Sequence, residues 1–91
     1  MGIDVYEEDV LPGKRGYIAV AAADRSVRVF SLSTGGQWET VFAQTFDEGF
    51  LPKVIRFRKN TRFLFIFSKT GGSVYVVFLS VGHSSFWQHQ A

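Results

Sequence analysis

The sequence predicts an all-β protein, and three observations lead to that prediction. Six segments of five to seven residues are rich in β-branched and aromatic side chains. Short turns containing glycine, asparagine or aspartate separate these segments. Apolar and polar residues alternate in several of them with the period of two that is typical of strands.

The predicted strands follow one another with a turn after each. They are Tyr17–Ala23, Val27–Leu32, Trp38–Phe42, Val54–Arg58, Arg62–Ser68 and Val74–Leu79. The run AVAAA at 19–23 would favour a helix by itself, because alanine is the best helix former. Asp24 ends that run, however, and Val27 and Val29 then alternate with Arg28 and Phe30. Turns are expected around Pro12, Asp24, Gly35, Asn60 and Gly71, with a second glycine at Gly36 and Gly72.

Two of these strands are apolar on both faces. In Val74–Leu79 both alternating sets of residues are apolar, and the run FLFIF at 63–67 has the same property. Such a sheet has to be covered on both sides, whereas a strand of an ordinary sandwich faces the core on one side only. Small sheets stacked radially provide that cover. The expected core draws on both halves of the chain: Ile18, Val20, Val27, Val29, Phe63, Phe65, Val74 and Val76.

The chain also contains an internal repeat. Ser26–Leu32 (SVRVFSL) matches Ser73–Leu79 (SVYVVFL) at an offset of 47, with four identical residues. Gly16–Val20 matches Arg62–Ile66 in character at an offset of 46. We therefore expect residues 1–91 to form a single β unit, with repeat one at about 3–46 and repeat two at about 47–90.

The stretch GYIAVAAADRSVRVFSLSTG at 16–35 resembles a repeat of the WD-repeat β-propeller family. Asp24 stands in the turn of that pattern, and Phe30-Ser31 stand where Trp-Asp is usual. The stretch VIRFRKNTRFLFIFSKTGGSVYVVFL at 54–79 resembles a second repeat, with Val77-Phe78 at the Trp-Asp place and no Gly-His dipeptide before Val54. The resemblance covers about residues 10–80. It implies two four-stranded antiparallel propeller-type blades that serve as a protein–protein interaction scaffold within a larger propeller or assembly.

Two blades are fewer than the four to eight of a complete propeller, so two outer faces would remain uncovered. Further blades in a longer chain, copies of this chain or a partner protein would complete the ring. The alternative fold is a small closed β-barrel made of the six strands, which needs no completion.

Charge is divided unequally along the chain, although the overall net charge is only +2. Residues 1–48 hold all eight acidic residues and four cations, and residues 49–91 hold six cations and no acid. A basic half favours a polyanionic partner, whereas cations on strand edges also discourage aggregation. The candidate basic interaction surface consists of Lys53, Arg56, Arg58, Lys59, Arg62 and Lys69.

Aromatic residues are interleaved with these cations, which leaves a second function open: a small basic, aromatic-rich β-domain that binds nucleic acid. Aromatic rings in strands stack on bases while Lys and Arg contact phosphates. Phe57, however, shares a strand face with Ile55, and Arg56 and Arg58 point the other way, so we expect Phe57 in the core. A protein partner is therefore the first expectation and nucleic acid the second.

No catalytic, cofactor-binding or metal-binding residue is expected, and we predict a non-enzyme. The chain has no cysteine, and no acidic residue follows Glu48 that would orient His83 or His89 or add a ligand. The glycine pairs at 35–36 and 71–72 are expected to form hairpin turns rather than phosphate-binding loops.

The location expected from the sequence is intracellular, either cytoplasmic or nuclear, without a membrane partner. The N-terminal segment MGIDVYEEDV is acidic, whereas a signal peptide begins with basic residues. The apolar runs Phe63–Phe67 and Val74–Leu79 are far shorter than the roughly 18 residues of a membrane span.

Overall fold

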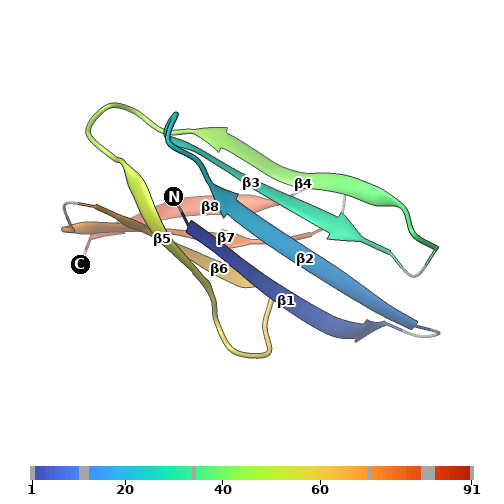
Figure 1. Ribbon diagram of the computed structural model, residues 1–91. Coiled ribbons are helices and arrows are strands. Elements are labelled where there is room, and N and C mark those ends of the chain that lie inside the picture. Colours follow the sequence, from blue (N-terminus) through green and yellow to red (C-terminus); the bar gives the residue numbers. More distant parts are fainter. Residues whose placement is uncertain (1, 11–12, 34, 70, 81–83, 91) are drawn as a thin grey trace.

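The described residues form eight strands and no helix (Figure 1). The computed structural model describes residues 2–10, 13–33, 35–69, 71–80 and 84–90. The strands are β1 (Gly2–Val10), β2 (Gly13–Ala21), β3 (Ser26–Leu32), β4 (Trp38–Thr45), β5 (Pro52–Phe57), β6 (Phe63–Ser68), β7 (Ser73–Phe78) and β8 (Ser85–Gln90). The all-β prediction is confirmed.

The strands form two four-stranded antiparallel sheets, as predicted. Strands β1–β4 make the first sheet and β5–β8 the second, each in the order of the sequence. The alternative of a closed barrel is wrong. In a closed barrel every strand pairs with a neighbour on both sides, whereas among the described strands β1, β4, β5 and β8 each pair on one side only.

Strands β1 and β8 were missing from the six predicted spans. Both are edge strands, and edge strands carry more polar residues than central ones. In β1 the apolar Ile3 and Val5 do alternate with Asp4, so a strand signal was present. β8 has the sequence SFWQHQ, which contains no β-branched residue. The β2 strand also begins at Gly13 rather than Tyr17, because Gly13–Ala21 pairs with the whole length of β1.

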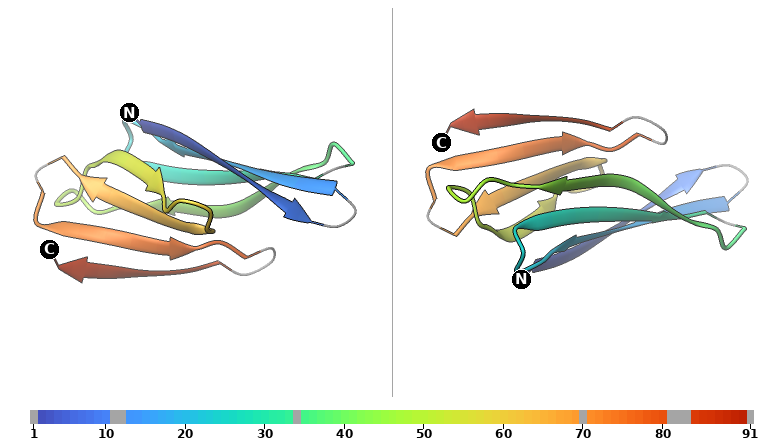
Figure 2. Two further views of the ribbon diagram at one scale, coloured as in Figure 1. Left: turned by 90° about the horizontal axis from the view of Figure 1, so that it is seen from below. Right: turned by 90° about the horizontal axis from the view of Figure 1, so that it is seen from above.

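The second sheet lies against one face of the first (Figure 2), with contacts between β1 and β5 at one edge and between β4 and β8 at the other. β5 lies beside β1, where the Phe57 N–H donates to Asp4 Oδ2 at 2.8 Å. At the other edge, the Phe42 ring of β4 and the Phe86 ring of β8 meet at 5.4 Å between centroids. There the Ser84 hydroxyl donates to the Val41 carbonyl at 2.7 Å.

The connection at 46–51 takes the chain from the β4 edge back to β5, which lies beside β1 (Figure 1). Phe46 and Phe50 are buried in this connection, with ring centroids 5.1 Å apart. Both rings also contact Tyr75 of β7, at 4.7 and 4.8 Å. The connection is thus anchored by aromatic packing against the second sheet.

The core lies between the two sheets and uses one face of each. Its buried members are Tyr17, Ala19, Ala21, Val27, Val29, Phe42, Phe46, Phe50, Ile55, Leu64, Ile66, Val77 and Leu79. Phe57, expected in the core, is half-buried and packs against it.

The predicted core is correct for Val27 and Val29 only. Ile18, Val20, Phe63, Phe65, Val74 and Val76 are half-buried and lie on the outer faces, opposite the core. The error has a physical cause: these strands are apolar on both sides, so their pattern does not say which side meets the other sheet.

Adjacent residues of β6 test the assignment of inner and outer faces. We expect Ile66→Ala to lower the free energy of unfolding by about 2–5 kcal/mol, because Ile66 is fully enclosed. Phe65→Ala should lower the free energy of unfolding by a smaller amount, because Phe65 is only half-buried. Urea unfolding at low protein concentration measures both, and a larger loss for Phe65→Ala would contradict the assignment.

Gly2 tests the close approach of β1 to β5. A Cβ atom at Gly2 would lie 2.6 Å from the Lys53 carbonyl oxygen, which belongs to the backbone and cannot turn away. Gly2→Ala should therefore destabilise the protein by about 1–3 kcal/mol. At Gly16, the matched control, a Cβ atom meets nothing within 4 Å, so Gly16→Ala should leave the melting temperature unchanged or raise it slightly. Equal effects would contradict the close contact.

Candidate interaction surface

The outer face of the second sheet is apolar and aromatic. Its side chains are Val54, Arg56, Phe63, Phe65, Phe67, Val74, Val76, Phe78 and Trp87. Trp87 is 46% exposed and Phe67 39%. A hollow of about 310 Å³ on this face is lined by Arg58, Phe63, Phe65, Val76 and Trp87. Arg58 thus borders a hollow that contains aromatic rings, and Arg56 lies on the same face beside Phe65.

The outer face of the first sheet carries an apolar patch as well, beside the charged Glu7, Lys14 and Arg28. Ile3, Val5 and Trp38 are each more than half exposed. A hollow of about 360 Å³ lies around Gly16, whose missing side chain leaves the space open. Val5, Glu7, Ile18, Leu32 and Trp38 are among the residues that line it. Contiguous exposed apolar surface of this kind marks an interaction site.

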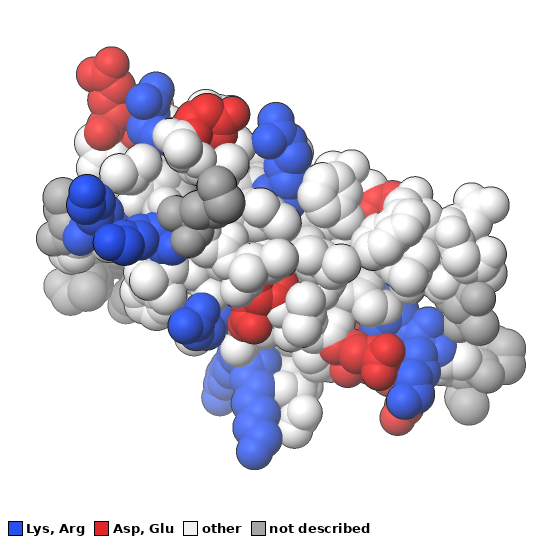
Figure 3. Space-filling view, in the orientation of Figure 1, with Lys and Arg blue, Asp and Glu red and all other residues white. Residues whose placement is uncertain are grey.

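The candidate basic residues gather around β5. Lys53 and Arg56 lie on that strand, Arg58 and Lys59 follow it, and Lys69 follows β6; all five are exposed. Figure 3 shows blue side chains over the left half of the view, where Figure 1 places β5 and the loop after it. Red side chains also lie among them at the upper left and near the centre, and on the right positive and negative side chains are mixed as well.

Arg62 is set apart from the other five cations by its contacts. Its Nε lies 3.7 Å from Glu8 Oε1 of β1, and its guanidinium lies 5.2 Å from the centre of the Phe78 ring. Both side chains of the ion pair are partly shielded from solvent. Arg62 therefore joins the two sheets.

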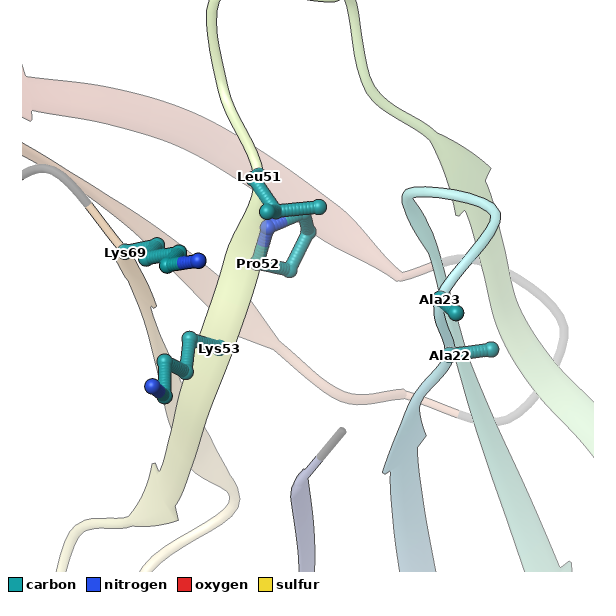
Figure 4. Close-up of a pocket in the computed structure, with 6 residues that line it drawn as sticks. All are labelled: Ala22, Ala23, Leu51, Pro52, Lys53 and Lys69. Atoms are coloured by element: carbon teal, nitrogen blue, oxygen red, sulfur yellow. The ribbon is translucent and has the colours of Figure 1, made fainter.

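Lys53 and Lys69 border a cleft of about 200 Å³ between the sheets. Figure 4 shows the two lysines on one side of Leu51 and Pro52, with Ala22 and Ala23 on the other side. The Lys69 N–H donates to the Leu51 carbonyl at 2.8 Å, which holds the end of β6 against the chain before β5.

Two tyrosines pack beside the Glu8 carboxylate. The Tyr6 and Tyr17 rings are stacked at 6.0 Å, and the Tyr6 hydroxyl donates to Glu8 Oε1 at 3.3 Å. Burial, and then the negative charge of Glu8, raises the pKa of both tyrosine hydroxyls. Both hydroxyls are therefore neutral at physiological pH, and the group has a structural role between the sheets.

The expected turn residues lie in loops. The Asp24 carboxylate accepts hydrogen bonds from the Ser26 hydroxyl and, at 3.1 Å, the Ser26 N–H. These bonds hold the pKa of Asp24 below its usual value of 3.8. Gly35 is exposed in the β3–β4 turn. Gly71 and Gly72 have φ values of 78° and 86°, a conformation that favours glycine. Pro12 and His83 lie outside the described residues.

The described residues contain no group of three or more histidine, cysteine, aspartate or glutamate side chains that could hold a metal ion. In the same ranges, the structure contains no helix with the length and apolar character to cross a membrane. Comparison of the chain with protein-family models, with curated proteins and with solved structures found no match. The similarity to WD repeats stays a prediction.

Asp24 gives a pH-dependent prediction. Because its pKa is lower in the folded protein, the carboxylate stabilises the fold above about pH 4, and this stabilisation is lost as the pH falls through the folded pKa. We therefore expect Asp24→Asn to lower the melting temperature at neutral pH and to match the wild type in strong acid. Ser26→Ala removes the hydroxyl donor and should reproduce part of the loss. A difference that persists in strong acid would contradict the role of the charge.

Proposed function

We propose that this chain forms two stacked blades of the WD-repeat propeller type and serves as a protein–protein interaction scaffold within a larger propeller or assembly. The observation that carries the proposal is the path of the 46–51 connection. It returns the chain from β4 to β5, which lies beside β1, so that like strands of the two sheets stand opposite each other.

This path favours repeated stacking over a simple sandwich. Had β5 been placed opposite β4, the chain would have closed on itself as a folded meander. With β5 beside β1, a third sheet can follow the second in the same way as the second follows the first. Radial repetition of small antiparallel sheets is the principle of a propeller.

The two apolar outer faces support the same proposal. Each sheet has one covered face and one face with exposed large apolar side chains, including Trp38 on the first sheet and Trp87 on the second. A domain of this size has little stability to spare, and solvent-exposed apolar faces would promote aggregation. Cover by a neighbouring sheet removes that cost. The function that follows is binding rather than catalysis.

A second candidate function, nucleic-acid binding, is favoured by one observation. Arg56 pairs across the strands with Phe65, and Arg58 borders the aromatic hollow that also contains Trp87. Cations beside exposed rings are the arrangement with which strands bind single-stranded nucleic acid. The same rings, however, are also what a neighbouring sheet would cover.

Cross-linking from a single engineered cysteine distinguishes the two functions, because the natural chain has no cysteine. Lys59→Cys places a reactive group on the exposed loop after β5. We expect it to capture a defined protein in cells, and the adduct should survive nuclease treatment. The matched control is Gln37→Cys, which is exposed in the turn before β4.

A protein adduct that disappears on nuclease treatment would contradict the scaffold proposal. It would support nucleic-acid binding if the purified chain also retards a labelled single-stranded nucleic acid in gel electrophoresis at low salt and releases it at high salt.

A further inference from the structure

We propose that copies of this chain associate head to tail, with the outer face of the second sheet of one copy packed on the outer face of the first sheet of the next. This inference rests on the proposed function, since it continues between copies the stacking seen within one. The occupant of both apolar faces is therefore a second copy of the chain.

The contacts between β1 and β5 define the alignment that stacking would repeat. Gly2 lies next to the Lys53 carbonyl, Asp4 accepts from the Phe57 N–H, and Glu8 pairs with Arg62. The first two contacts occur in the same order along β1 and β5, and the third continues that order with Arg62, which lies between β5 and β6. β1 and β5 therefore run in the same direction, and each level of the first sheet has a matching level in the second.

Equivalent positions on the two outer faces follow from strand pairing. In the first sheet, Glu7 of β1 lies opposite Gly16 of β2. In the second, the Arg58 N–H donates to the Phe63 carbonyl at 2.8 Å, which places Arg58 opposite Phe63. Gly16 and Phe63 each precede a fully buried residue, Tyr17 and Leu64 respectively. Glu7 and Arg58 therefore lie at matching levels on the two outer faces, and so do Gly16 and Phe63.

These equivalent residues are complementary in charge and in shape. Glu7 borders the hollow on the first sheet and lies 3.6 Å from the Lys14 ammonium, but its side chain remains 63% exposed. Arg58 is exposed and borders the hollow on the second sheet. If stacking continues at the same level, the Arg58 guanidinium of one copy meets the Glu7 carboxylate of the next. Phe63 then faces the open space above Gly16, where the absent side chain leaves room for a ring.

The contact joins two different surfaces, so it is heterologous and leads to a ring when the rotation between copies closes. Each copy contributes two sheets. Three copies would provide six sheets and four copies would provide eight sheets. Both numbers fall within the range of about four to eight blades found in propellers. We therefore expect a discrete trimer or tetramer rather than a two-fold symmetric dimer.

Filling the hollow tests the contact without disturbing the fold. Gly16→Leu adds a side chain where a Cβ atom meets nothing within 4 Å, so the single chain should remain folded. In sedimentation velocity, the wild type should sediment as a discrete oligomer and Gly16→Leu as a monomer. Gly49→Leu is the matched control, since Gly49 is equally open but lies in the 46–51 connection. It should associate as the wild type does.

Charge exchange tests the direction of the contact. Glu7→Arg and Arg58→Glu should each weaken association by about tenfold at moderate salt. The double variant Glu7→Arg/Arg58→Glu should restore it, because only a heterologous contact joins position 58 of one copy to position 7 of another. Circular dichroism checks that each variant keeps its β spectrum.

Three outcomes would overturn the inference: a monomeric wild type, an oligomer that Gly16→Leu leaves intact, or a double variant no better than the single ones. None of these decides the proposed scaffold function, which depends on the cross-linking result. A nuclease-sensitive adduct would instead count against that function and leave the contact between copies to be judged by sedimentation.

Discussion

The contact between β1 and β5 is the constraint on which the rest of this structure depends. β5 approaches β1 so closely that only a glycine fits at position 2, and the Asp4 carboxylate satisfies the Phe57 N–H at 2.8 Å. A backbone donor at a sheet edge would otherwise need water or another strand. Once this edge is set, one face of each sheet is turned inward and the other outward.

The inner faces are matched in size. The first sheet contributes the small Ala19 and Ala21 from β2, and the second contributes the larger Leu64 and Ile66 from β6. Pairing small with large side chains lets two sheets interdigitate at native packing density. At the β4 edge and in the connection to β5, the rings of Phe42, Phe46 and Phe50 belong to the same buried cluster. The many phenylalanines of this chain thus have two uses, in the connection and on the outer face.

The outer faces explain why a chain of 91 residues has strands that are apolar on both sides. Nothing inside the single chain needs Ile18 or Phe65 to be apolar, since both lie away from the core. Their chemistry makes sense when another sheet covers them. The two faces also differ from each other, with Glu7 and Gly16 on one and Arg58 and Phe63 on the other, and this difference would give the proposed stack of copies a direction.

The sequence alone determined the all-β class and six of the eight described strands, β2 to β7, because period-two patterning and turn residues such as Asp24 and Gly71 act over a few neighbouring positions. The resemblance to WD repeats implied two four-stranded antiparallel sheets, and the charge pattern indicated a basic set of residues in the second half. Tertiary structure alone decided which face of each strand is buried, since Tyr17 and Ile18 are both apolar and only the position of the other sheet separates them. The same holds for Arg62, which its contact with Glu8 withdraws from the basic surface. Local pattern specifies a strand, but the choice between its two faces comes from long-range packing.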